Sequence, residues 1–199
     1  MGLSMSAVIL DKELLLSVSK PARYIGGEIG SVIKDWSSVD VRLALCFPDV
    51  YEIGMSHLGL RILYDLVNKR GDCLAERVFS PWGDMEEKMR FAGIPLFSLE
   101  SHRPVREFDI LGFSLSYELS YTNVLNALAL SGLPLAASAR DASYPLVIAG
   151  GASSLNPEPM AAFIDAFVIG EAEEALVDIL DVFRSWKSHA ARQKIDLLT

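Results

Sequence analysis

The sequence predicts an α/β domain built on a doubly wound, five-stranded parallel sheet of flavodoxin-like order 2-1-3-4-5, with an N-terminal helical extension. Short apolar runs suited to buried strands alternate with segments of helical period, which favours a parallel sheet covered by helices on both faces. Five such strand and helix units follow one another. Because ligands of doubly wound sheets collect at the carboxyl ends of the strands, we expect the functional site at that edge.

The individual elements follow from periodicity and turn residues. Strands are expected at 41–47, 76–79, 109–117, 146–149 and 166–169, with a small extra strand at 96–99 and a central position for 109–117. Helices are expected at 57–69, 81–93, 121–133 and 172–186. In the second of these helices, Ser80 is expected to be the cap and Pro81 the first helical residue.

The chain is expected to have three segments. Residues 1–38 form an extension with a helix at about 7–18, residues 39–187 form the main domain, and residues 188–199 begin a linker. The last segment is weakly amphipathic and ends without a capping or turn residue, which favours a continuation into a further domain.

Composition limits the partners of this chain. The net charge of -8 disfavours direct binding of nucleic acid, which needs clustered Lys and Arg. No apolar run reaches the roughly 18 residues of a membrane span, and the opening segment lacks the basic residues of a secretory signal. We therefore expect a cytoplasmic protein without a membrane partner. Two cysteines and three histidines are too scattered for a metal site, and Cys46 is expected in the core.

Small and polar residues follow four of the predicted strands. Glycines permit close approach of a ligand to the backbone, and serines supply hydroxyl groups. Each glycine taken alone fits a tight turn, and each glutamate fits a helix cap. Because four such ends meet at one edge, we expect a small-molecule site there. The candidate residues are Asp49, Tyr51, Glu52, Gly54, His57, Gly59, Ser114, Ser116, Tyr117, Gly150, Gly151, Gly170 and Glu171.

Other ligand motifs fit this edge poorly. Gly54 and Gly59 have the glycine spacing of a P-loop, but Leu60 and Arg61 replace the residues that reach phosphate and magnesium. The dinucleotide fingerprint is absent after the first strand. The third and fifth strands lack the aspartate and lysine of a phosphate-accepting receiver, and the first loop lacks the hydroxyl-rich turn that FMN requires.

Seven sequence blocks carry a family resemblance. They are R-Y-I-G-G-E, F-P-D-V-Y-E-I-G-M-S-H-L-G, P-W-G-D-M-E, L-F-S-L-E-S, G-F-S-L-S-Y-E-L-S-Y-T-N-V-L, A-G-G-A-S-S-L-N-P-E-P and I-G-E-A-E-E. Together they resemble the amino-terminal part of the cobalamin-binding-domain radical S-adenosylmethionine (SAM) proteins, over about residues 20–185. Asp49, Tyr51 and Gly54 match the D-x-H-x-x-G signature of cobalamin-binding domains, with tyrosine in place of the cobalt-ligating histidine.

The resemblance implies a cobalamin-type domain that precedes a catalytic barrel. In that barrel a C-x-x-x-C-x-x-C loop holds a [4Fe-4S] cluster that cleaves SAM reductively. The loop is absent from these 199 residues. We therefore expect no catalysis and no catalytic residue in this segment, and we expect the C-terminal radical SAM domain of the same protein as its partner.

The resemblance also implies where a corrinoid would lie. The corrin ring is expected across the strand ends, with the nucleotide tail between the sheet and neighbouring helices. The residues that match the signatures are Asp49, Tyr51, Gly54, Ser114, Ser116, Gly150 and Gly151. A tyrosine phenol keeps its proton near neutral pH, so the lower face of cobalt is expected to be open or capped by water.

Two alternatives stay open. His57 is a second candidate cobalt ligand, although its position at the start of a helix favours a surface or capping role. At the level of the whole domain, a docking or homodimerisation scaffold that has lost ligand binding is the alternative function.

Overall fold

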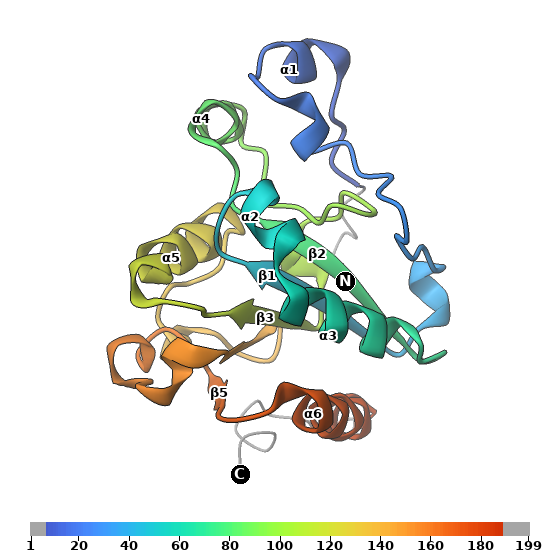
Figure 1. Ribbon diagram of the computed structural model, residues 1–199, viewed down its shortest axis with the longest axis vertical. Helices are drawn as coiled ribbons and strands as arrows, with labels where there is room; N and C mark the ends of the chain where they lie inside the picture. Colours follow the sequence, from blue (N-terminus) through green and yellow to red (C-terminus); the bar gives the residue numbers. More distant parts are fainter. Residues whose placement is uncertain (1–6, 189–199) are drawn as a thin grey trace.

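The computed structural model describes residues 7–188, which form a five-stranded sheet of order β2-β1-β3-β4-β5. Every strand pair is parallel. The predicted α/β class and strand order are confirmed, as is the central position of the third strand (Figure 1). The strands are β1 (Val41–Phe47), β2 (Cys73–Phe79), β3 (Ile110–Ser114), β4 (Leu146–Gly150) and β5 (Ala166–Val168).

Helices cover both faces of the sheet. They are α2 (Tyr51–Ser56), α3 (Leu58–Asn68), α4 (Gly83–Ala92), α5 (Tyr121–Leu130) and α6 (Ala172–Lys187). Side chains alternate across each strand, so Leu43 and Leu45 of β1 pack with the buried faces of α3 and α6. Ala44 and Cys46 point the other way and pack with α4 and α5. The sheet therefore separates two hydrophobic cores.

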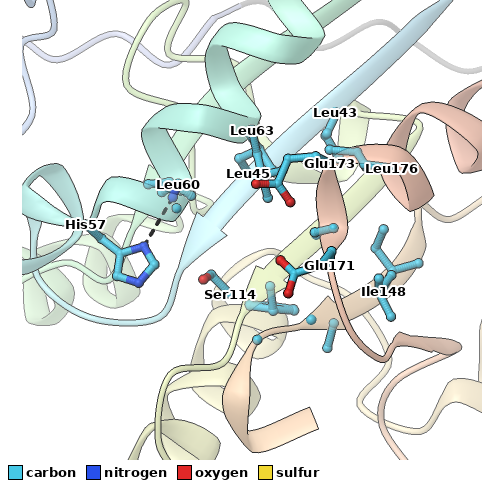
Figure 2. Close-up of a pocket in the computed structure, with 18 of the residues that line it drawn as sticks. Leu43, Leu45, His57, Leu60, Leu63, Ser114, Ile148, Glu171, Glu173 and Leu176 are labelled. Atoms are coloured by element: carbon cyan, nitrogen blue, oxygen red, sulfur yellow. Dashed lines mark hydrogen bonds between the residues drawn. The ribbon is translucent and has the colours of Figure 1, made fainter. Parts of the chain in front are cut away.

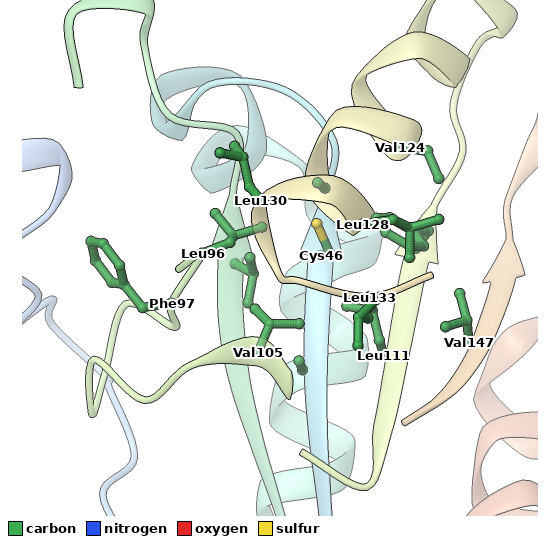
Figure 3. Close-up of a cluster of buried hydrophobic side chains, with 14 of the residues drawn as sticks. Cys46, Leu96, Phe97, Val105, Leu111, Val124, Leu128, Leu130, Leu133 and Val147 are labelled. Carbon is green, nitrogen blue, oxygen red and sulfur yellow. The ribbon is translucent and has the colours of Figure 1, made fainter. Parts of the chain in front are cut away.

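Cys46 lies in the second of these cores, among Leu111, Leu128 and Leu133 (Figure 3). Its side chain is fully buried, and burial raises the pKa of its thiol above the usual range. The thiol therefore stays protonated and behaves as a small apolar group. The core position predicted for Cys46 is confirmed.

The structure differs from the sequence expectations at several element ends. The loop after β1 contains the additional helix α2. Helix α4 begins at Gly83, so the expected start at Pro81 with Ser80 as cap is wrong. The N–H of Trp82 donates to the hydroxyl of Tyr24, which keeps Trp82 extended outside the helix. Residues 96–99 form no strand of the sheet. Only the Leu99 N–H donates to β2, at the Arg77 carbonyl, while Leu96 and Ser98 also bond residues 103–105. Helix α5 ends at Leu130, before Leu133.

The N-terminal extension runs past the outer edge of β2 (Figure 1). Its helix α1 (Lys12–Leu16) is shorter than expected, because the Ser17 hydroxyl donates back to the carbonyl of Leu14 and ends it. Apart from Ser188, the linker expected at 188–199 lies outside the described residues. Within residues 7–188, no helix combines the length and apolarity needed to cross a membrane.

Candidate functional site

A cavity of about 260 Å³ opens at the carboxyl end of the sheet, between α3 and α6 (Figure 2). Its inner walls are apolar. They consist of Leu43, Leu45, Leu60, Leu63, Ile148 and Leu176. Such a slot, apolar inside with polar groups near its opening, is the usual form of a small-molecule site.

Gly112 of β3 forms the floor of the cavity between β1 and β4. A Cβ atom placed there would lie 3.5 Å from Leu43 Cδ1 and 3.6 Å from Ile148 Cγ1. These are ordinary contact distances, so the strand itself would accept a side chain at this position. The glycine therefore keeps space open above the sheet.

Backbone and short side chains form the mouth. Ser114, Gly150 and Gly170 come from the ends of β3, β4 and β5. Gly151 has φ 107°, and a Cβ there would lie 2.6 Å from the Leu115 carbonyl oxygen. Only glycine fits that turn. The carboxylates of Glu171 and Glu173, at the start of α6, complete the polar part of the mouth.

His57 lies on the α3 side of the mouth and caps that helix. Its Nδ1 accepts a hydrogen bond from the Leu60 N–H at 3.1 Å, the usual N-cap geometry. Its ring packs on Phe47, with ring centroids 4.8 Å apart. The capping role expected for a histidine at this helix start is thus present, and the ring also lines the cavity.

Asp49, Ser116 and Tyr117 lie near the mouth without lining the cavity. The Tyr117 hydroxyl donates to Asp49 Oδ2 at 2.8 Å, and this bond raises the pKa of Tyr117 above its usual range. The Ser116 hydroxyl lies 3.4 Å from His57 Nε2. These pairs connect the loop after β1 to the loop after β3.

Tyr51 and Glu52 face the N-terminal extension, away from the cavity. The Tyr51 hydroxyl donates to Glu28 Oε1 at 2.6 Å, and burial together with this bond raises the pKa of Tyr51 to about 12. Glu52 pairs with Arg23 and Lys20, which lower the pKa of its carboxyl to about 2. Both side chains hold the extension against α2.

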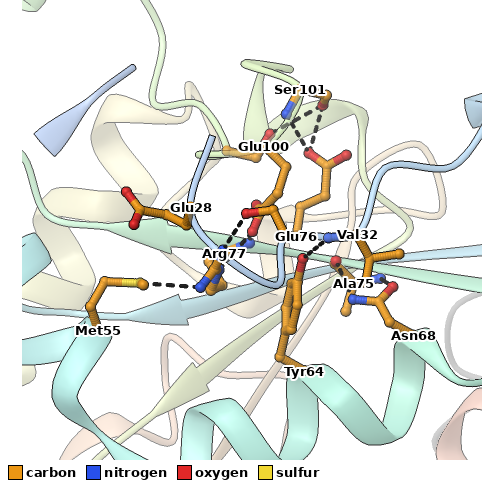
Figure 4. Close-up of polar contacts among 12 residues, drawn as sticks. Glu28, Val32, Met55, Tyr64, Asn68, Ala75, Glu76, Arg77, Glu100 and Ser101 are labelled. Atoms are coloured by element: carbon orange, nitrogen blue, oxygen red, sulfur yellow. Dashed lines mark hydrogen bonds and ion pairs between the residues drawn. The ribbon is translucent and has the colours of Figure 1, made fainter. Parts of the chain in front are cut away.

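Deeper contacts continue this attachment along β2 (Figure 4). The buried Arg77 pairs with the buried Glu100 at 2.6 Å and donates to the Ser31 hydroxyl of the extension. The Tyr64 hydroxyl of α3 accepts a hydrogen bond from the Val32 N–H at 2.8 Å. The extension thereby satisfies polar groups along the outer strand of the sheet.

Gly54 has a packing role. A Cβ atom there would lie 2.3 Å from Phe79 Cε1 and 3.2 Å from Phe47 Cβ. The glycine is buried and lets α2 lie directly on the Phe79 ring and the Phe47 side chain at the sheet end. It does not line the cavity.

The cavity thus brings together seven of the thirteen predicted residues. They are His57, Gly59, Ser114, Gly150, Gly151, Gly170 and Glu171. Sequence reasoning missed the apolar walls, Gly112 and Glu173. Gly112 carried a usable signal, since a glycine inside an apolar strand indicates close approach of another group. The leucines of the cavity walls gave no sequence signal, because leucines of an ordinary hydrophobic core have the same spacing.

A comparison with known protein families bears on the function of this cavity. A family model described as "Radical SAM proteins, N-terminal" matches residues 59–199, which is 141 of 199 residues. The chain belongs to this family. Membership implies a parent protein with other domains. A search of curated proteins found no match.

In this radical SAM N-terminal domain, the matched segment includes β2 to β5 and most of the cavity mouth. Asp49, Tyr51 and Gly54 precede it. Among the described residues, no three His, Cys, Asp or Glu side chains gather in a way that could hold a metal ion. The apolar walls and the few polar groups at the mouth suit an organic ligand held by shape, apolar contact and a small number of hydrogen bonds.

Proposed function

We propose that this domain binds a corrinoid of the cobalamin type and presents it to the catalytic domain of a radical SAM protein. The observation that carries the proposal is the apolar cavity at the carboxyl ends of β1, β3, β4 and β5, with glycines and a serine at its mouth. A flat macrocycle can lie on such a rim, because glycines leave the backbone uncovered. The nucleotide tail of the same ligand ends in an apolar benzimidazole base, and this apolar appendage can enter the slot between α3 and α6.

The residues that would hold the corrinoid divide by position. Gly150, Gly151 and Gly170 would lie beneath the ring, and Ser114 would offer a hydroxyl to its edge. Gly112 and the leucines of the slot would contact the apolar appendage. The bound cobalt would supply methyl-transfer or electron-transfer chemistry, while the partner domain would hold the [4Fe-4S] cluster and SAM.

The cobalt would have no histidine ligand from the loop after β1, where Asp49, Tyr51 and Gly54 match the D-x-H-x-x-G signature. Tyr51 occupies the signature position, but its hydroxyl is engaged by Glu28 and its pKa of about 12 keeps it protonated. Both features make it unsuitable as a ligand, because a phenol binds a metal as the phenolate. The lower face of cobalt is thus proposed to be open or water-capped.

A titration with hydroxocobalamin, followed by gel filtration, tests the proposal. We expect a spectral shift and a corrinoid that co-elutes with the protein. Gly112→Val should abolish both, because the added side chain fills the floor of the slot. Gly71→Val is the matched control, since a Cβ at Gly71 meets no atom within 4 Å. Absence of any shift in the unmodified chain would contradict the proposal.

A docking scaffold is the second candidate, and one observation favours it. Apolar side chains near the carboxyl edge are strongly exposed, with 66% for Leu58, 83% for Leu119, 74% for Leu155 and 56% for Ile169. Exposed apolar groups on a rim indicate contact with a large surface. Two results together would support this second function. The domain would bind no corrinoid in the titration, and it would associate with the catalytic domain of its parent protein.

A further inference from the structure

The hydrogen-bonding pattern of His57 fixes which of its nitrogens carries the proton. Nδ1 accepts from the Leu60 N–H, so its lone pair points at that donor. A neutral imidazole has one N–H, which must then be on Nε2. At the cavity mouth, His57 is therefore a hydrogen-bond donor.

The Nε2–H donor is held in place, but it makes only a long contact within the described part of the protein. Phe47 supports the ring on one side, and a Cβ on Gly59 would lie 3.0 Å from His57 Cε1, so glycine leaves room for the ring. The nearest acceptor of Nε2–H is the Ser116 hydroxyl at 3.4 Å. That distance is long for a hydrogen bond, so a ligand acceptor can replace it at little cost.

The other side of the mouth offers acceptors. Glu171 and Glu173 line the same cavity, and Figure 2 shows both carboxylates turned toward it. Both residues are solvent-exposed, and among residues 7–188 neither carboxylate makes a hydrogen bond or ion pair within the protein. An anionic group placed between His57 and the glutamates would satisfy His57 but would be repelled by the two carboxylates. A cation would leave the His57 donor without an acceptor.

We propose that this mouth selects uncharged carboxamide groups, with His57 donating to an amide oxygen and Glu171 or Glu173 accepting from an amide nitrogen. A carboxamide both accepts and donates, so it matches both sides of the mouth. This inference rests on the proposed function, since a corrin ring of the cobalamin type carries carboxamide side chains around its edge. In this arrangement His57 is a positioning residue for the ligand and does not bind cobalt.

The test compares hydroxocobalamin with its monocarboxylates, in which one ring amide is hydrolysed, each positional isomer measured separately. At least one isomer should bind the unmodified chain more weakly, on the order of fivefold. Glu171→Gln with Glu173→Gln should reduce that preference to within about twofold. Glu174→Gln is the matched control, because Glu174 follows in the same helical turn and does not line the cavity.

The His57 contribution is separated from helix capping by two variants. His57→Asn keeps a capping acceptor and loses the imidazole donor, so it should weaken hydroxocobalamin binding about fivefold, while the urea midpoint falls only by the lost ring packing on Phe47. His57→Ala should weaken binding and lower the midpoint further, because it also removes the acceptor that caps α3. In the Co(II) form, electron paramagnetic resonance should show no change when the protein histidines carry ¹⁵N.

Three results would overturn the inference. They are equal affinity for hydroxocobalamin and every monocarboxylate, a preference that survives both glutamine substitutions, and ¹⁵N-sensitive hyperfine structure that His57→Asn removes. Each of these requires a bound corrinoid and so leaves the proposed function standing. If no corrinoid binds, the proposed function fails, and this inference fails with it.

Discussion

At the scale of single residues, three side-chain positions in the loop after β1 have separate structural roles. Asp49 accepts from Tyr117, Tyr51 donates to Glu28, and Gly54 permits contact with Phe79. Tyr51 begins α2, and Gly54 lies three residues further along, on the same face of that helix. Tyr51 also packs edge-to-face on Phe79, with ring centroids 5.7 Å apart, so the loop joins the mouth of the cavity to the N-terminal extension beside this shared ring.

Gly54→Ala should destabilise the fold. The added methyl group would lie 2.3 Å from the Phe79 ring and 3.2 Å from Phe47 Cβ, so α2 or the ring must move. We expect the free energy of unfolding to fall by about 1–3 kcal/mol, as for other overpacked cores. Urea denaturation measures the change. Gly83→Ala, where a Cβ meets open space, should cause no loss, and equal losses in both variants would contradict this explanation.

Glu52 should make stability depend on acid pH. Arg23 and Lys20 lower the pKa of its carboxyl from 4.5 to about 2 in the folded protein. The stabilisation by this charge is therefore fully present above pH 4.5 and is lost as the pH falls toward 2. Glu52→Gln should lower the urea midpoint at pH 7 and have a much smaller effect near pH 2, where the carboxyl is half protonated. Glu174→Gln serves as control, and an effect of Glu52→Gln that is the same at both pH values would refute the assignment.

At the scale of elements, site residues at strand ends were predictable from the sequence, whereas the side-chain directions in the loop after β1 were not. Ser114 and Gly150 line the cavity because they end strands whose positions the apolar pattern predicted. Tyr51 and Glu52 point elsewhere because helix α2, too short for its periodicity to be recognised, sets their direction. Their partners Glu28 and Arg23 are more than 20 residues away in sequence, so no local pattern could indicate them.

The attachment of the extension to α3 should depend on a single hydroxyl. Tyr64 accepts from the Val32 N–H, and its ring lies under the Arg77 guanidinium at 4.6 Å. Tyr64→Phe keeps the ring and removes the acceptor, so stability should fall by about 1 kcal/mol. Amide hydrogen exchange at Val32 should become faster while exchange in β3 and β4 changes little.

Tyr144→Phe is the matched control for this experiment, because Tyr144 also lies beside an arginine, Arg106, at 4.9 Å. It should leave exchange at Val32 unchanged. If Tyr64→Phe gives the same exchange rate at Val32 as the unmodified chain, the hydroxyl does not hold the extension.

At the scale of the whole molecule, the fold was predictable where burial on both faces of a parallel sheet forces apolar strands. Strand β1 matches its predicted bounds, since Leu43 and Cys46 face two different cores and both must be apolar. The cavity was not predictable in the same way. It exists because α3 and α6 leave space above Gly112, and that spacing depends on the packing of every helix on this face.

Ligand binding should therefore raise the free energy of unfolding of the whole domain. A ligand that binds only the folded chain adds about 2.7 kcal/mol to the free energy of unfolding at a concentration of 100 times its Kd. Hydroxocobalamin should produce this increase in urea denaturation, and Gly112→Val should remove it while Gly71→Val retains it. An increase that persists in Gly112→Val would place the corrinoid outside the cavity, because the slot above β3 would then be irrelevant to binding.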